Sequence, residues 1–289
     1  MTQGDIAASV RARLLNRAKA EGTDFNQMLV RYALERVLYR ISQSAYSEQF
    51  LLKGAMLFAL WYNMPHRPTR DIDLLGYGKN DPDSIVNIFR EIVSITVEDG
   101  IYFDAQNISA TEIQKEAGYS GVRVNIIGEL SRAECRVQID IGFGDAVTPE
   151  ALIADYPSLL TDIPAPRIKT YPVYTVIAEK LHAIVVLGMA NSRMKDYFDL
   201  WVLLDRESLN DEILSKAVSA TFLCRKTPIP SQMPLGLSEV FVQDKNCQIR
   251  WQAFLKKNNL GGLSLDETVS ILRSRLYPVL ESISVQGEK

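Results

Sequence analysis

Two acidic residues two positions apart, Asp71 and Asp73, form the pattern with the clearest chemical meaning. They alternate with Ile72 and Leu74. Residues two apart on a β-strand project from the same face, so the pattern predicts both carboxylates on one face and the apolar side chains in the core. Two carboxylates are the usual protein share of a Mg²⁺ site that substrate phosphates complete. Solvated carboxylates on an edge strand would show the same pattern, so both interpretations stay open.

Two further segments could belong to the same site. Lys53-Gly54-Ala55 precedes the acidic pair, and Gly54 permits a tight turn and a close approach of backbone to a phosphate. Asp140 lies in a run that otherwise alternates toward an apolar face, and a third carboxylate on a neighbouring strand would complete a two-metal clamp. The alternatives are a plain turn at Gly54 and an exposed strand residue at Asp140.

A third group of charges follows on two expected helices. Lys180 lies in the first helix, and Arg193, Lys195 and Asp196 lie at the start of the second. The cations could bind phosphates, and Asp196 could orient a lysine or a metal-bound water. Ser192 is a plausible N-cap and Lys195 could pair with Asp199 at i,i+4, so a capped helix with surface ion pairs explains the pattern equally.

Composition excludes several classes of protein. The 289 residues are 47% hydrophobic and 23% charged, as in ordinary globular proteins, and the net charge of −3 gives no sign of a nucleic-acid coat. The three cysteines lack Cys-x-x-Cys spacing and the two histidines lack partners at ligand spacing, so neither a disulfide framework nor a zinc site is expected. His182 is expected to be structural, and His66 has no expected role.

The elements that position these residues change in type along the chain. Apolar spacing predicts two helices within 5–42, then a short helix, a strand and a helix, and three β-like runs; the expected ranges are 50–62, 71–77, 82–96, 101–109, 122–127 and 135–141. Prolines make 142–171 a connecting segment. The remainder is expected to be helical apart from a loop at 226–244.

These elements predict an α+β protein with a mixed sheet, in which residues 1–165 hold the N-terminal helices and the catalytic core. Residues 166–289 would form a helical domain that completes the active site. The N-terminal segment lacks the apolar core of a signal peptide, and no stretch approaches the roughly 20 apolar residues of a membrane span. We therefore expect a cytoplasmic protein that does not associate with membranes.

The ordered motifs resemble those of the AbiEii/AbiGii-type nucleotidyltransferase toxins of type IV toxin–antitoxin systems, which include the mycobacterial MenT proteins. The matching stretches are FLLKGAMLFALWY, RPTRDIDLLG, VQIDIGF, YTVIAEKLHAIVVLG and NSRMKDYFDLWVL. They extend from about Phe50 to Leu204. An ordered set of this kind is more specific than any one motif.

The resemblance implies a DNA polymerase β-like nucleotidyltransferase core, Mg²⁺ (or Mn²⁺) as cofactor and an NTP as donor. Asp71 and Asp73 match the metal-binding pair, Lys180 the lysine that contacts the triphosphate, and Asp196 the later functional aspartate; Asp140 is a further candidate metal ligand. Lys53, Gly54, Ala55, Arg193 and Lys195 are candidate nucleotide-binding residues. Family members often have Gly-Ser or Gly-Gly where this chain has Gly54-Ala55, which removes a hydroxyl that could bind phosphate.

The resemblance also implies an acceptor and a partner. The acceptor would be RNA, in particular the tRNA 3′ end, with translation blocked as the result. A cognate antitoxin is expected, commonly without a stable complex. Two alternatives remain, a protein or small-molecule acceptor and a nucleotide-binding module without catalysis.

Overall fold

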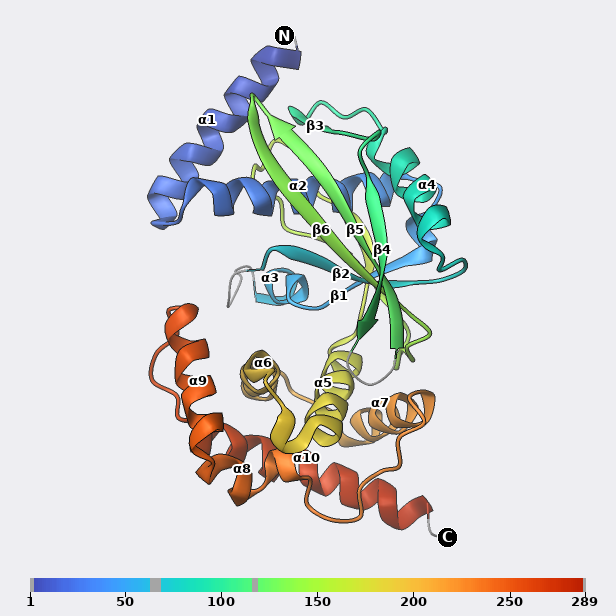
Figure 1. Ribbon diagram of the computed structural model, residues 1–289, viewed down its shortest axis with the longest axis vertical. Coiled ribbons are helices and arrows are strands. Elements are labelled where there is room, and N and C mark those ends of the chain that lie inside the picture. The colour runs from blue at the N-terminus through green and yellow to red at the C-terminus, as the bar shows by residue number, and fades with distance from the viewer. Residues whose placement is uncertain (1–2, 63–68, 116–118, 288–289) are drawn as a thin grey trace. The chain divides into compact units, whose positions relative to one another are not determined.

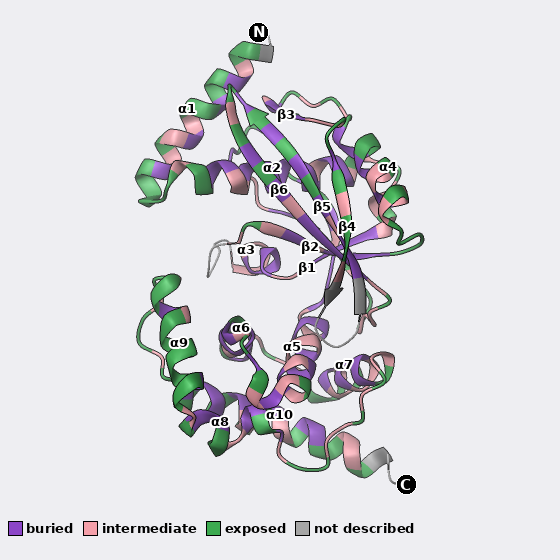
Figure 2. Ribbon diagram, viewed as in Figure 1, coloured by how far each residue is buried: buried purple, intermediate pink, exposed green. Residues whose placement is uncertain are grey.

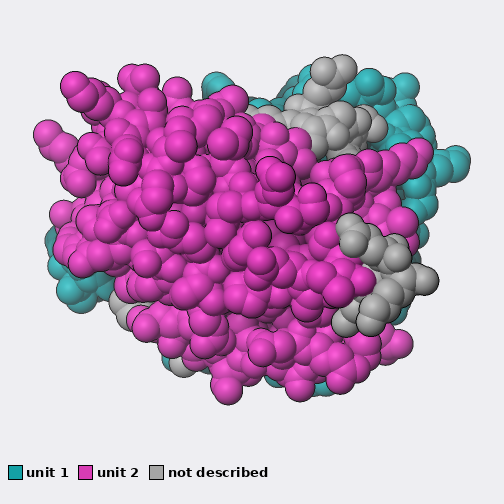
Figure 3. All heavy atoms as spheres, turned by 90° about the horizontal axis from the view of Figure 1, so that it is seen from below, with its two compact units in different colours: residues 1–144, 152–170 teal, residues 145–151, 171–289 magenta. Residues whose placement is uncertain are grey.

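The computed structural model describes residues 3–62, 69–115 and 119–287 (Figure 1). Contacts divide the chain into two compact units, one made of 1–144 with 152–170 and the other of 145–151 with 171–289 (Figure 3). His66 and the first two residues of the RPTRDIDLLG stretch lie outside the described residues.

The first unit is built on a mixed sheet. Among the described residues the sheet has eight strands in the order β3-β5-β6-β2-β1-β8-β7, with β4 paired to β5. The strands are β1 (Phe50–Lys53), β2 (Asp71–Gly76), β3 (Ile101–Phe103), β4 (Ser109–Lys115), β5 (Tyr119–Leu130), β6 (Ala133–Phe143), β7 (Leu152–Asp155) and β8 (Arg167–Thr170). The pairs β2–β6 and β1–β8 are parallel and the others are antiparallel.

Four helices accompany this sheet: α1 (Gln3–Glu21), α2 (Phe25–Gln43), α3 (Met56–Tyr62) and α4 (Pro82–Val93). Helix α2 packs against β6 and β8, and α4 packs against β4 and β5. Asp81 caps α4, because its side chain accepts a hydrogen bond from the Ser84 backbone and Pro82 occupies the first turn. The buried bands of β5 and β6 are visible in Figure 2.

The second unit is helical. Its helices are α5 (Val173–Leu187), α6 (Met194–Arg206), α7 (Asp211–Cys224), α8 (Glu239–Gln243), α9 (Lys245–Lys257) and α10 (Leu265–Gly287). Helix α5 packs against α6 and α7, and α10 packs against the same two helices. The expected class, α+β with a mixed sheet followed by helices, is confirmed.

Two segments expected to be irregular contain regular elements. Residues 142–171 hold β7 and β8, which extend the sheet beyond β1, and residues 226–244 hold α8. Conversely, Phe50–Lys53 forms strand β1 rather than the start of a helix. These short elements have no clear periodicity of their own, and pairing or packing with distant residues decides their conformation.

One window within the second unit, Val173–Ala190, has a mean hydropathy of 1.5 and is long and apolar enough to span a membrane by length and composition. This corrects the expectation that no stretch comes near that length. A core helix of a soluble protein meets the same criterion. The buried side chains of α5 include Ile177, Leu181 and Ile184, which are fully buried among the helices of this unit.

Candidate active site

Four neighbouring strands align charged residues in one row. Lys53 of β1 pairs with Asp73 of β2, Asp73 pairs with Asp140 of β6, and Asp140 pairs with Arg123 of β5. Side chains of directly paired residues project from the same face of a sheet and lie next to one another. We call Lys53, Asp73, Asp140 and Arg123 the charged row. In it two carboxylates stand between two cations.

Asp71 extends the acidic part of this face. It lies two residues before Asp73 on β2, and both side chains are partly exposed, whereas Ile72 and Leu74 are fully buried. The alternation expected from the sequence is therefore observed. The Thr69 hydroxyl donates a hydrogen bond to Asp71 Oδ1 at 2.9 Å. This bond orients one carboxylate oxygen and leaves the other for a further partner.

Gly54 makes room for the Asp73 carboxylate. Its φ of +75° lies in the left-handed region, which favours glycine. A Cβ at this position would lie 2.2 Å from Asp73 Oδ2 and 2.8 Å from Asp73 Cβ. Glycine is therefore required twice, by the backbone and by the neighbouring carboxylate. Lys53, immediately before it, is 7% exposed and buries its side chain within the site.

Arg123 binds Asp140 through both arms of its guanidinium. Nε and one terminal nitrogen each donate to a different carboxylate oxygen at 2.8 Å. These bonds raise the pKa of Arg123, and the charges of Asp71 and Asp73 raise it further while partial burial opposes the shift. The three carboxylates therefore act electrostatically on one cation, even though only Asp140 bonds to it.

The arrangement suits a hard divalent cation at Asp71 and Asp73. Both supply oxygen ligands, and the space left by Gly54 keeps the backbone clear of the Asp73 carboxylate. Within 3–62, 69–115 and 119–287 no group of three His, Cys, Asp or Glu side chains is placed so that it could hold a metal ion by itself. Asp140 is held by Arg123, so Asp71 and Asp73 on β2 are the carboxylates that remain available to bind a divalent cation.

The helical unit holds a second cluster. Lys180 of α5 donates to Asp196 Oδ1 at 2.9 Å and to Asp199 Oδ2 at 2.7 Å, and Arg193 Nε donates to Asp196 Oδ2 at 2.6 Å. Both aspartates are fully buried, whereas 36% of the Arg193 side chain is exposed. The structure thus brings three predicted residues, Lys180, Arg193 and Asp196, into direct contact.

Charge pairing keeps Asp196 ionised. Complete burial by itself would raise the pKa of this carboxyl, but the charges and hydrogen bonds of Lys180 and Arg193 outweigh burial and lower it. A buried carboxylate can in turn fix the position of a lysine ammonium. The cluster therefore pairs two cations with two carboxylates, for a formal net charge of zero, and the partly exposed Arg193 guanidinium lies at its edge.

Two local expectations in this region are wrong. Lys195 is exposed, and Asp199 faces the interior, where it accepts its bond from Lys180 instead of Lys195. Ser192 does not cap α6, since Arg193 is the N-cap residue and the buried Asn191 side chain accepts from the Arg193 backbone at 2.8 Å. The predicted nucleotide-binding role of Lys195 remains a prediction.

Arg123 and Asp199 were not singled out as site residues. Arg123 alternates with Val122, Val124 and Ile126, which point to the core. This pattern indicates that Arg123 points away from the core, but it does not identify Asp140 as its partner. His182 is buried and its Nε2 lies 2.8 Å from Oγ1 of the half-buried Thr227, which fits the structural role expected of His182.

Comparisons with known proteins identify the family of this chain. A family model described as the nucleotidyl transferase AbiEii toxin of type IV toxin–antitoxin systems matches residues 36–270. A search of curated proteins gave no match.

Two solved structures are similar to this chain. One is a candidate nucleotidyltransferase from Helicobacter pylori, with a TM-score of 0.50 and 16% identity, covering 88% of this chain and 95% of that chain. The other is JHP933 from Helicobacter pylori, with a TM-score of 0.48 and 13% identity, covering 89% and 93%. At these identities the likeness concerns the fold alone. The family match, by contrast, spans most of the sequence, and the chain belongs to the AbiEii nucleotidyltransferase toxins of type IV toxin–antitoxin systems.

Proposed function

We propose that this chain transfers a nucleoside monophosphate from an NTP to RNA, with the tRNA 3′ end as acceptor, and thereby blocks translation. The observation that carries the proposal is the register of β2 and β6, which sets Asp73 beside Asp140 with Asp71 two residues away on the same face. Three carboxylates so placed could bind the metal ions of a triphosphate and accept the proton of an attacking hydroxyl. Family membership supports the reaction class, and the choice of RNA rests on the resemblance.

In the proposed reaction the oxygen of the acceptor 3′ hydroxyl forms a bond to the α-phosphorus of the NTP. The bond between that phosphorus and the bridging oxygen to the β-phosphate breaks, and pyrophosphate leaves with the electron pair. The hydroxyl proton passes to a carboxylate or to water. Asp140 is the proposed acceptor for this proton or a further metal ligand, and Arg123 holds its carboxylate in place.

The remaining residues bind and orient. Asp71 and Asp73 would hold Mg²⁺ or Mn²⁺, which when bound neutralises phosphate charge and stabilises the attacking and leaving oxygens. Lys53, Gly54 and Ala55 are proposed to contact phosphate.

By the same resemblance we propose roles in nucleotide binding for charged residues of the helical unit. Lys180 and Arg193 would supply positive charge to the triphosphate, and Lys195 would add a further cation. Asp196 would keep the first two in position through the bonds described above.

A label-transfer experiment tests the proposal. Purified protein is incubated with Mg²⁺, total tRNA and each α-labelled NTP in turn, and label in RNA is followed on a denaturing gel. Asp71→Asn should abolish transfer while its melting temperature stays near that of the wild type, because Asp71 is partly exposed. Asp83→Asn is the matched control, since Asp83 is an exposed carboxylate in the first turn of α4 in the same unit.

Label in tRNA from one NTP, absent with Asp71→Asn and present with Asp83→Asn, supports the proposal. Label in protein or in a small molecule instead would retain the reaction class and replace the acceptor. NTP binding without transfer to any acceptor, and without a requirement for Mg²⁺, would reject catalysis. We further propose that the protein acts in the cytoplasm and that its cognate antitoxin opposes it without a stable complex.

A further inference from the structure

A pocket of about 400 Å³ opens inside the first unit, beside the carboxylates but separate from the charged row. Its walls come from the end of α1, the first half of α2, the start of α3, Thr69 and Arg70, and the segment 156–159. Ligand pockets in proteins span about 300–1,000 Å³. This volume is therefore enough for one small molecule or one unit of a polymer.

The pocket has an apolar floor and a polar rim. Val30 and Leu34 of α2 and Met56 of α3 supply the floor, and Asn26 and Gln27 bring amide groups to the edge. An amide side chain both donates and accepts hydrogen bonds, as the edge of a nucleobase does. The combination of apolar side chains with amide groups in one pocket is chemistry that can bind a heterocyclic base.

Guanidinium groups add the capacity to bind phosphate. Arg17, Arg31 and Arg70 line the pocket. Arg17 and Arg31 both pair with Glu21. Arg70 is exposed and makes no hydrogen bond or ion pair with any other residue that the structure describes. A guanidinium recognises phosphate through two parallel hydrogen bonds, and Arg70 is the cation here that is free to form them.

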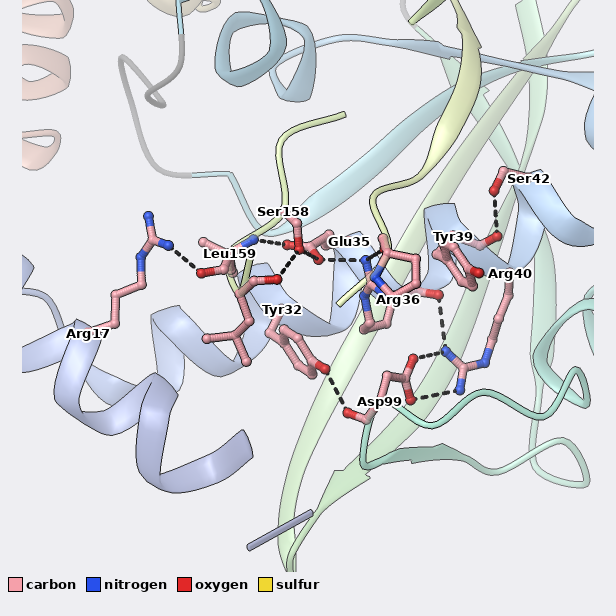
Figure 4. A network of polar contacts seen from close by, with 12 residues as sticks. Arg17, Tyr32, Glu35, Arg36, Tyr39, Arg40, Ser42, Asp99, Ser158 and Leu159 are labelled. Atoms are coloured by element: carbon pink, nitrogen blue, oxygen red, sulfur yellow. Dashed lines mark hydrogen bonds and ion pairs between the residues drawn. The ribbon is translucent and has the colours of Figure 1, made fainter. Parts of the chain in front are cut away.

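A buried network fixes one wall of the pocket (Figure 4). Glu35 of α2 accepts hydrogen bonds from the Leu159 backbone at 2.7 Å and from the Ser158 hydroxyl at 3.0 Å, and Arg36 donates to it at 2.6 Å. Arg17 also donates to the Leu159 carbonyl. The segment 156–159 is therefore held to α2 and α1 by its backbone, so the pocket is already formed before a ligand arrives.

Thr69 connects the pocket to the proposed chemistry. Its side chain lines the pocket and also donates to Asp71 Oδ1 at 2.9 Å. Arg70, the next residue, precedes Asp71 directly. A molecule in the pocket thus lies one side chain away from a proposed metal ligand.

We propose that this pocket binds one nucleoside unit of the reacting nucleotide, with its base on the α2 floor and its phosphate toward Arg70. The proposal rests on the proposed transfer reaction and adds a binding site to it. The unit belongs either to the donor NTP or to the 3′-terminal nucleotide of the RNA acceptor, and binding measurements distinguish the two.

The test compares pocket variants with matched controls. Val30→Trp fills the pocket from α2, and Leu152→Trp adds the same bulk at an exposed position of β7 that does not line it. Arg70→Gln removes the free guanidinium, and Arg132→Gln removes an exposed one from the turn between β5 and β6. Binding of α,β-methylene NTP analogues, which cannot transfer, and of labelled total tRNA is measured with Mg²⁺ for each protein.

Val30→Trp should weaken one probe by at least about tenfold and Arg70→Gln by about fivefold, while both controls bind as the wild type does. A loss for the analogues assigns the pocket to the donor, and a loss confined to tRNA assigns it to the acceptor.

Wild-type binding by both pocket variants, or no binding of either probe to the wild type, overturns the proposal. If Val30→Trp fails to fold, Arg70→Gln decides. Pocket-dependent binding without label transfer would refute the proposed function but not the proposed binding site. Label transfer at an unchanged KM in both variants would refute the binding site but not the proposed function.

Discussion

Replacing Arg123 by Met tests how the charged row is balanced. The substitution keeps most of the side-chain stem and removes two charge-assisted hydrogen bonds to Asp140, whose side chain is 10% exposed. Breaking a fully buried ion pair from one side costs about 3–5 kcal/mol, and an exposed pair is worth about 0–1 kcal/mol. With 39% of Arg123 exposed, we expect the variant to lose about 1–3 kcal/mol, a fall in Tm of roughly 3–10 °C.

The same change should strengthen binding of a divalent cation. Asp140 becomes free to join Asp73, and one positive charge leaves the surroundings of Asp71 and Asp73. Two unit charges 4 Å apart interact by about 1 kcal/mol in water, so with a doubly charged ion we expect about 1–2 kcal/mol. That corresponds to roughly 5–30-fold tighter binding of Mn²⁺. Part of the stability lost in EDTA should therefore return as Mn²⁺ is added.

Thermal denaturation in EDTA and in a Mn²⁺ titration, with Mn²⁺ binding followed by electron paramagnetic resonance, measures both effects. Arg132→Met is the control, because Arg132 lies exposed in the turn of the same hairpin. In the double variant Arg123→Met/Asp140→Asn no carboxylate loses its partner, so most of the stability should return. A wild-type Tm in EDTA together with unchanged Mn²⁺ affinity for Arg123→Met would refute this account of the row.

Three further predictions concern single residues. Gly54→Ala should abolish transfer and lower the free energy of unfolding by about 1–3 kcal/mol, because the added Cβ would collide with Asp73 and the backbone of residue 54 is left-handed. Urea denaturation and the label-transfer assay check this prediction, and full activity would contradict it. Asp196→Ala should cost about 1–3 kcal/mol, because Lys180 keeps Asp199 but loses one of its two carboxylates and Arg193 loses its partner. The contribution of Asp196 is fully present above pH 3.8 and should decline as the pH falls from there toward the lowered folded-state pKa; an unchanged unfolding free energy would be the contrary result. Burial first, and then the charge of Arg225, lower the pKa of His182 to about 4, so protonation of the unfolded chain below pH 6.5 should destabilise the wild type by about 2–3 kcal/mol at pH 4.5. His182→Gln should lose that much less between pH 7.5 and pH 4.5 in urea denaturation, and an identical pH dependence would count against this assignment.

The strands that carry the carboxylates could be predicted because their signal is local. Ile72 and Leu74 alternate with Asp71 and Asp73, and a half-buried strand needs nothing more for its faces to be assigned. The pairing of Asp73 with Asp140 depends on the register of strands far apart in sequence. The register of a strand is set by the whole sheet. The sequence could therefore suggest that Asp73 and Asp140 share a site, but it could not show that they are directly paired.

The short strands and the ion-pair partners could not be predicted from the sequence for the same reason. β7 and β8 are four residues each, and their strand geometry comes from pairing with one another and with β1. Asp199 was given to Lys195 by helical spacing, but burial turned it toward Lys180 on another helix. The domain boundary near residue 165 and the roles of the site residues stay predictions.

The charged row also shows how this fold can keep a third carboxylate beside an acidic pair. Ionised carboxylates on neighbouring strands repel one another, and directly opposed like charges destabilise a sheet. Here Lys53 stands on the far side of Asp73 and Arg123 on the far side of Asp140, so each acidic residue has one cationic neighbour in the row. Asp71 has no cation opposite it in the β2–β6 pairing, where its neighbour is Gln138. The net negative charge on this face is therefore greatest at Asp71, which follows Thr69 and Arg70 in the sequence. A divalent cation, either free or already bound to a phosphate, would be bound most strongly at this position.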